Sequence, residues 1–156
     1  MGLFNGKDKN GNLKIQMVHI EGLPNYVEKA WLYVTLDNTN KQITFKGINK
    51  KDTEINLPID KITGIGSVSE EIVKENSGVG RAIAGSLLFG GAGAVVGAVT
   101  AKDKKKTIYY KVINYVSNNE ERSIILGTRG DINELKFFRK LNELLPKQEK
   151  PSSIDL

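Results

Sequence analysis

Apolar and polar residues alternate in short runs along most of the chain, which is the pattern of half-buried β-strands. In the clearest run, Leu32, Val34 and Leu36 fall on one face and leave the residues between them for the other face. Clusters of Asn, Asp, Gly and Pro separate the runs and predict turns. Glycines within the fifth run, Gly64 and Gly66, predict a bulge or a sharp bend there. The expected strands cover residues 13–17, 30–36, 41–46, 54–59, 62–68, 107–116 and 122–126.

The last part of the chain changes to a helical period. Apolar residues there recur every three or four positions, as one face of an amphipathic helix requires. Asp131 is the expected N-cap with Glu134 three positions later, and Pro146 is expected to end the helix. The predicted inward face consists of Ile132, Leu135, Phe138, Leu141 and Leu145. Seven strands followed by one helix predict an α+β domain.

Residues 78–101 interrupt the β pattern with a glycine-rich stretch that carries no charge from Ala82 to Ala101. As one helix this stretch would be about 30 Å long, enough to cross a bilayer. A single crossing would separate the strands before it from those after it and leave the sheet with open edges. The stretch is therefore expected to turn back at Phe89–Gly93 and to form a helical hairpin.

Small residues recur at four-residue spacing in this hairpin, and Gly93 and Gly97 form a small-xxx-small unit that lets helix backbones approach closely. Helices so rich in glycine need a partner, which is another copy of the chain, lipid or the same chain. Of these, self-association is favoured. The contact residues expected in a self-associating or membrane-inserted hairpin are Gly85, Phe89, Gly90, Gly93, Gly97 and Ala101. Basic residues expected at the base of the hairpin in every case are Arg81, Lys102, Lys104, Lys105 and Lys106.

Three segments resemble one known family: His19-Ile-Glu-Gly-Leu-Pro24, the run from Ile55 to Ile62, and the glycine-rich stretch. The family consists of small bacterial and prophage proteins with a PH-like, or GRAM-like, domain. The resemblance covers residues 13–145. It implies a seven-stranded antiparallel PH-like barrel with a C-terminal capping helix and an inserted glycine-rich helical hairpin. It also implies a phage-related setting, and it implies no activity.

Outside this domain, residues 1–12 are expected to form a flexible leader and residues 146–156 a flexible tail. The first residues have no apolar core of signal-peptide length, which predicts a cytoplasmic protein, membrane-associated if the hairpin meets lipid. The net charge of +5 is mild.

The sequence disfavours catalysis. The chain has no cysteine, and His19 is its only histidine, so neither a metal site nor a Ser-His-Asp arrangement is expected. No complete phosphate-binding glycine loop or nucleophile elbow occurs. We therefore expect no enzyme, no cofactor and no metal, and we interpret His19 as a structural strand residue.

The favoured hypothesis is a non-catalytic PH-like interaction module that forms a homo-oligomer through the hairpin. One alternative is a phage inhibitor of host defence that sequesters a nucleotide signal or a host protein. Another is a peripheral membrane protein with a re-entrant hairpin. Phosphoinositide binding is disfavoured because the first hairpin loop, residues 21–29, carries two acids and one lysine where such PH domains cluster Lys and Arg. Nucleic-acid binding is disfavoured because core packing explains the tyrosines at 109, 110 and 115.

Overall fold

The computed structural model describes residues 6–49, 51–76, 108–128 and 132–145. Within these ranges, seven strands form one antiparallel sheet in the order β4-β3-β2-β1-β7-β6-β5. The elements in chain order are β1 (Lys14–Glu21), β2 (Trp31–Asp37), β3 (Gln42–Gly47), β4 (Ile55–Pro58), the 3-10 helix η1 (Ile59–Lys61), β5 (Ile62–Ser69), α1 (Glu70–Asn76), β6 (Tyr109–Ser117), β7 (Glu120–Gly127) and α2 (Ile132–Leu144).

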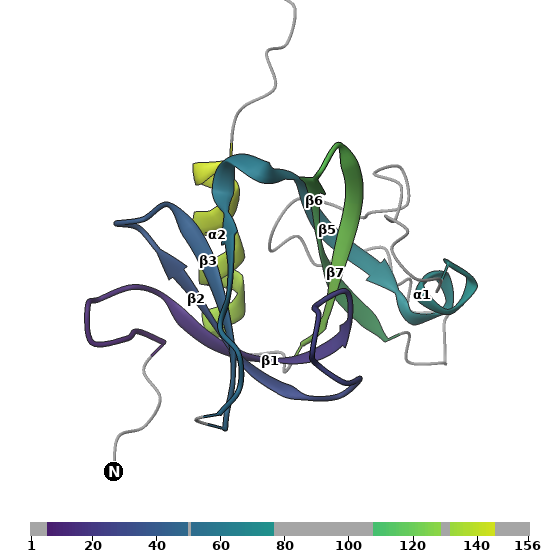
Figure 1. The fold of residues 1–156 in the computed structure, drawn as a ribbon, viewed down its shortest axis with the longest axis horizontal. Helices are drawn as coiled ribbons and strands as arrows, with labels where there is room; N and C mark the ends of the chain where they lie inside the picture. The colour runs from purple at the N-terminus through teal and green to yellow at the C-terminus, as the bar shows by residue number, and fades with distance from the viewer. Residues whose placement is uncertain (1–5, 50, 77–107, 129–131, 146–156) are drawn as a thin grey trace, which may run out of the picture.

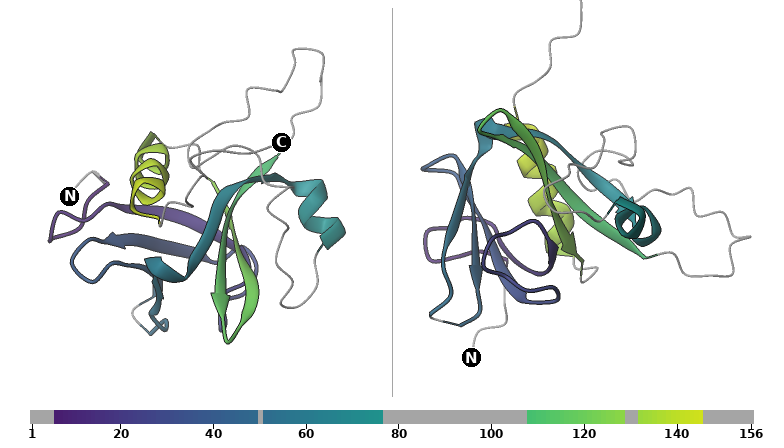
Figure 2. Two further views of the ribbon diagram at one scale, coloured as in Figure 1. Left: turned by 90° about the horizontal axis from the view of Figure 1, so that it is seen from above. Right: turned by 45° about the vertical axis from the view of Figure 1, so that its right-hand side comes forward.

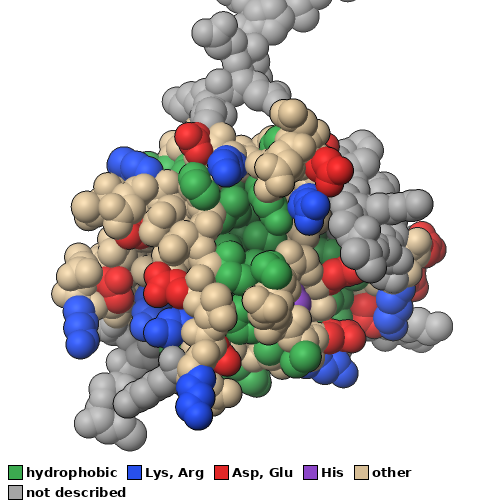
Figure 3. Space-filling model, viewed as in Figure 1, with side chains coloured by type: hydrophobic (Ala, Val, Ile, Leu, Met, Phe, Trp, Pro, Cys, Tyr) green, Lys and Arg blue, Asp and Glu red, His purple; other side chains and the backbone are tan. Residues whose placement is uncertain are grey.

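The sheet bends into two arms, β1–β4 and β5–β7, and α2 lies between them (Figures 1 and 2). Both arms and the helix contribute to the main hydrophobic core, whose fully buried aromatic residues are Phe45, Phe137 and Phe138. Hydrophobic side chains gather in the middle of the face seen in Figure 3, and charged side chains lie mainly around its edge. The core therefore depends on strands from both sides of the glycine-rich stretch.

The strand pattern read from the sequence is confirmed in its main features. Leu32, Val34 and Leu36 are completely buried, while the residues between them are only partly so. The register of β5 with β6 shifts between Ile62 and Gly64, where the glycines predicted a bulge. The first strand is longer than predicted, because its pairing with β7 continues to Glu21.

The C-terminal helix is present, but its predicted inward face is partly wrong. Ile132 is 65% exposed, whereas Phe137 and Glu134 are buried. The rings of Phe137 and Phe138 meet edge-on with their centres 5.3 Å apart, and both are buried although they are adjacent in sequence. A helix held between two arms of a sheet buries a wider face than a surface helix does. The buried face of α2 therefore includes Glu134 and Phe137, and it does not include Ile132. The expected cap Asp131 and stop Pro146 lie outside the described residues.

Helix α1 was not predicted from the sequence. Glu70 and Glu71 begin this helix, where acidic side chains interact favourably with the helix dipole. The Ser69 hydroxyl accepts a hydrogen bond from the Ile72 N–H at 3.3 Å, as an N-cap does. Val73 packs with buried residues of β5, β6 and β7 in a second, smaller hydrophobic cluster. The two turns of α1 contain too few apolar residues to show a period, so only the packing reveals the helix.

The ordered fold begins before residue 13. Lys7 forms a bridge with Leu13, and the Asp8 carboxylate accepts hydrogen bonds from the backbone N–H groups of Asn10 and Asn12. Residues 6–12, which the sequence assigned to a leader, thus form a turn beside β1. The remaining leader residues and the predicted tail lie outside the described residues.

Candidate functional site

The base of the glycine-rich insertion is defined by the ends of two neighbouring strands. The last residue of β5, Ser69, pairs with the first residue of β6, Tyr109. One step further out, the Glu70 N–H donates a hydrogen bond to the Ile108 carbonyl at 2.8 Å. The chain therefore leaves and re-enters the sheet at one place. The prediction that the parts before and after the insertion build the same sheet is confirmed.

A small polar cluster ties α1 to β6 at this base. The Tyr110 hydroxyl donates to one carboxylate oxygen of Glu70 at 3.0 Å, and Lys74 contacts the other oxygen at 2.7 Å. The hydrogen bonds from Lys74 and Tyr110 lower the pKa of Glu70, while burial and the bond to Glu70 raise the pKa of Tyr110. The cluster holds the start of α1 against the strand to which the chain returns.

The residues predicted to carry the function of the insertion all lie outside the described residues. The predicted contact and basic positions, Gly85, Phe89, Gly90, Gly93, Gly97, Ala101, Arg81, Lys102, Lys104, Lys105 and Lys106, therefore stay predictions, as does the helical hairpin itself.

A second feature, which we call the loop hollow, lies between the β1–β2 loop (22–30) and the β3–β4 loop (48–54). Its volume is about 350 Å³. Its lining residues are Asn25, Tyr26, Val27, Ala30, Trp31, Ile48, Asn49 and Asp52. This hollow was not predicted from the sequence, because its residues come from two loops that only the fold brings together. The available signal was Trp31, a large aromatic residue on the outward face of β2.

Hydrogen bonds of Tyr26 and His19 hold the walls of the loop hollow in place. The Tyr26 hydroxyl accepts from the Gly47 N–H at 2.8 Å and donates to the Thr53 carbonyl, so it joins the two loops. Beneath the first loop, His19 Nε2 accepts from the Leu23 N–H at 3.1 Å. An amide can only donate, so the imidazole proton is on Nδ1, which lies 2.9 Å from the Val27 carbonyl and donates to it. His19 is buried, and its interpretation as a structural residue is confirmed.

The charge of the loop hollow is wrong for a phosphorylated headgroup. Among its described lining residues, the only charged one is Asp52 of the β3–β4 loop, and Lys29 of the β1–β2 loop does not line it. A carboxylate at the edge of an apolar hollow repels phosphate groups. The expectation that the protein does not bind phosphoinositides through its first hairpin loop stays a prediction.

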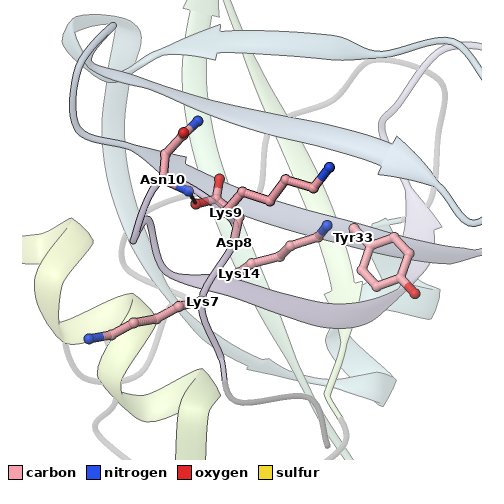
Figure 4. A pocket seen from close by; sticks show the side chains of 6 residues that line it. All are labelled: Lys7, Asp8, Lys9, Asn10, Lys14 and Tyr33. Atoms are coloured by element: carbon pink, nitrogen blue, oxygen red, sulfur yellow. Dashed lines mark hydrogen bonds between the residues drawn. The ribbon is translucent and has the colours of Figure 1, made fainter. Parts of the chain in front are cut away.

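A basic hollow of about 460 Å³ lies on the outer side of β1 and β2 near the N-terminal turn. Lys9 and Lys14 extend toward Tyr33, and the Lys14 ammonium lies 4.5 Å from the centre of the tyrosine ring (Figure 4). The Asp8 carboxylate in this hollow is held by the backbone of its own turn. The feature is a solvated basic surface rather than an enclosed site.

One buried lysine lies inside the fold between β6 and α2. The Lys111 ammonium donates to the Ser67 hydroxyl at 3.1 Å and lies 5.4 Å from the centre of the Phe138 ring. Burial lowers the pKa of Lys111, and the nearby Glu134 carboxylate opposes this effect. The side chain therefore carries its charge in the folded protein at a cost in stability.

This cost predicts a pH-dependent stability. Between the lowered pKa of folded Lys111 and the ordinary lysine value of about 10.4, the unfolded chain binds more protons, so stability rises with pH. The free energy of unfolding of the wild type, minus that of Lys111→Met, is expected to increase toward pH 10 by at most about 1.4 kcal/mol per pH unit. Denaturant unfolding at several pH values measures this difference. The exposed Lys140→Met is the control, and a difference that falls with pH would contradict the prediction.

Two further observations concern the part of the chain that the structure describes. It contains no group of three or more His, Asp or Glu residues that could hold a metal ion. None of its helices is both long enough and apolar enough to span a membrane.

A seven-stranded antiparallel sheet with a C-terminal helix between its two arms defines the chain as a PH-like domain. Residues 24–136 match the model of the family described as glycine zipper containing PH domain, and the chain belongs to this family. Domains of this kind are in general interaction modules without catalytic activity. No curated protein and no solved structure matches the chain.

Proposed function

We infer that the protein is a non-catalytic PH-like module that self-associates through its glycine zipper. The observation that carries this proposal is the pairing of Ser69 with Tyr109, which brings the strands on either side of the uncharged stretch together at one edge of the domain. A hairpin requires that the chain leave and return at neighbouring positions, and this pairing meets that requirement. A phage or prophage origin stays a prediction.

The physical reason for self-association is the composition of the stretch. Residues 82–101 carry no charge, and their five glycines weaken an isolated helix by roughly 1 kcal/mol each relative to alanine. Close approach of a second backbone at the glycine positions offsets this loss through packing. Copies arranged around a symmetry axis would bury the arms and display the PH-like domains outward.

Light scattering on the full chain at micromolar concentration tests the proposal. The wild type is expected at a multiple of the 17.2 kDa chain mass. Gly93→Leu adds a side chain on the zipper track and is expected to weaken association by at least about tenfold, because the backbones can no longer approach. Val95→Leu adds bulk on the opposite helical face and is the matched control. A monomeric wild type, or equal effects of the two variants, would contradict self-association, and a wild type recovered only with detergent would favour a membrane hairpin.

A further inference from the structure

The loop hollow is the strongest exposed apolar feature of the described part of the chain. In the described part of the chain, five large hydrophobic side chains are exposed. Three of the five line this hollow: Val27 at 75%, Trp31 at 45% and Ile48 at 49% exposure. Large apolar side chains scattered singly over a surface are ordinary, but a group around one concavity is typical of an interaction site.

The hollow is also preorganised, because its walls do not depend on a ligand for their position. Tyr26 joins the two loops through its hydroxyl, and the backbone N–H of His19 donates to the Ala30 carbonyl at 2.7 Å. The β3–β4 loop is closed by its own turn, in which the Asn49 N–H donates to the Asp52 carboxylate at 3.1 Å. Binding of a partner would therefore cost little conformational entropy in these two loops.

The charge of the hollow indicates the chemistry of that partner. The whole chain carries a net charge of +5, yet among the lining residues that the structure describes the one charged residue, Asp52, is acidic. One oxygen of Asp52, Oδ2, accepts the hydrogen bond of its own turn, and two asparagines, Asn25 and Asn49, also line the hollow. Such a site suits an apolar group that fills the concavity and a cationic group that reaches the carboxylate.

We propose that the loop hollow binds a peptide segment of a partner protein through a large aliphatic side chain followed by a lysine or arginine. The aliphatic side chain packs against Val27, Trp31 and Ile48, and the cation pairs with Asp52. None of the described lining residues belongs to the glycine-rich insertion, so the proposal is argued independently of self-association.

A titration of the full chain with short blocked peptides tests the proposal. Trp31 is the only tryptophan, so its indole N–H gives one resonance in an amide-correlation NMR spectrum and reports on the hollow directly. The probe is acetyl-Ala-Leu-Lys-Ala-amide at millimolar concentration. We expect saturable shifts of this resonance and of amides in both loops. Acetyl-Ala-Leu-Glu-Ala-amide is expected to bind about fivefold more weakly, and acetyl-Ala-Ala-Lys-Ala-amide more than about tenfold more weakly.

Variants at exposed positions separate binding from folding. Val27→Ser is expected to weaken binding of the leucine-lysine peptide, whereas Ile132→Ser, at another exposed apolar residue away from the hollow, leaves it unchanged. Asp52→Asn keeps an acceptor for the Asn49 N–H and is expected to abolish the preference for lysine over glutamate. The proposal is overturned if no peptide gives a saturable shift, if the lysine and glutamate peptides bind equally, or if Ile132→Ser acts like Val27→Ser. Because each readout is local, all of these outcomes are independent of the oligomer mass.

Discussion

Gly22→Ala is expected to lower the free energy of unfolding by about 3 kcal/mol or more. Gly22 follows β1 with a φ of +108°, a conformation that side chains with a β-carbon rarely adopt. A β-carbon there would overlap the Ser123 carbonyl oxygen and come within 2.9 Å of the Ile124 Cα atom. Both neighbours belong to the backbone of β7, which is paired on both sides and cannot move away.

Denaturant unfolding of the full chain measures this change, and Gly64→Ala is the matched control. A β-carbon at Gly64 would meet nothing within 4 Å, so that variant is expected to stay within about 0.5 kcal/mol of the wild type. Similar unfolding curves for Gly22→Ala and Gly64→Ala would show that the close approach of the first loop to β7 is wrong.

His19→Leu is the second substitution with a large expected effect, a loss of about 3 kcal/mol. Leucine fills much of the buried volume but can neither accept from the Leu23 N–H nor donate to the Val27 carbonyl. The hydrogen bond to Leu23 is itself buried, so its loss leaves a backbone donor without its protein acceptor. The β1–β2 loop is expected to loosen before the rest of the domain unfolds.

Two measurements distinguish this effect from ordinary core damage. Met17→Leu changes a completely buried residue on the same face of β1 without removing a polar contact, and it is expected to cost less than about 1.5 kcal/mol. Amide hydrogen exchange at Leu23 should accelerate in His19→Leu and remain slow in Met17→Leu. Unchanged protection at Leu23 in His19→Leu would refute the role assigned to the imidazole.

The two substitutions also bear on the loop hollow, because both act at the root of its first wall. Gly22 allows the chain to turn against β7, and His19 holds the loop that follows from below. If either variant folds, weaker binding of the leucine-lysine peptide is expected together with the loss of stability.

Much of the fold could be predicted because its strands have one buried and one solvated face. The alternation in β2 survives in the structure residue for residue, and the bulge in β5 is where its glycines indicated. The same reasoning predicted that the strands before and after the insertion belong to one sheet, because a barrel built from both needs the chain to return. These inferences rest on local period and on chain connectivity, both of which are visible in the sequence.

The remaining features could not be predicted because each depends on contacts between distant segments. Helix α1 is held by the packing of Val73 on the outer face of β5–β7, and its sequence shows no helical period of apolar residues. The inward face of α2 turns to bury Phe137 in place of Ile132 because two arms of the sheet enclose it. The loop hollow joins Val27, Trp31 and Ile48, none of which lies in a recognisable motif.

The sequence by itself determined the sheet, the C-terminal helix, the position of the insertion and the absence of a catalytic motif, since hydrophobic period and residue chemistry are local properties. Only the tertiary structure decided which loops meet, and therefore where an apolar, acidic hollow lies on a basic protein. Proximity in space is set by strand order and by hydrogen bonds between distant segments, such as that between Tyr26 and Gly47, and these contacts do not follow from a local sequence pattern.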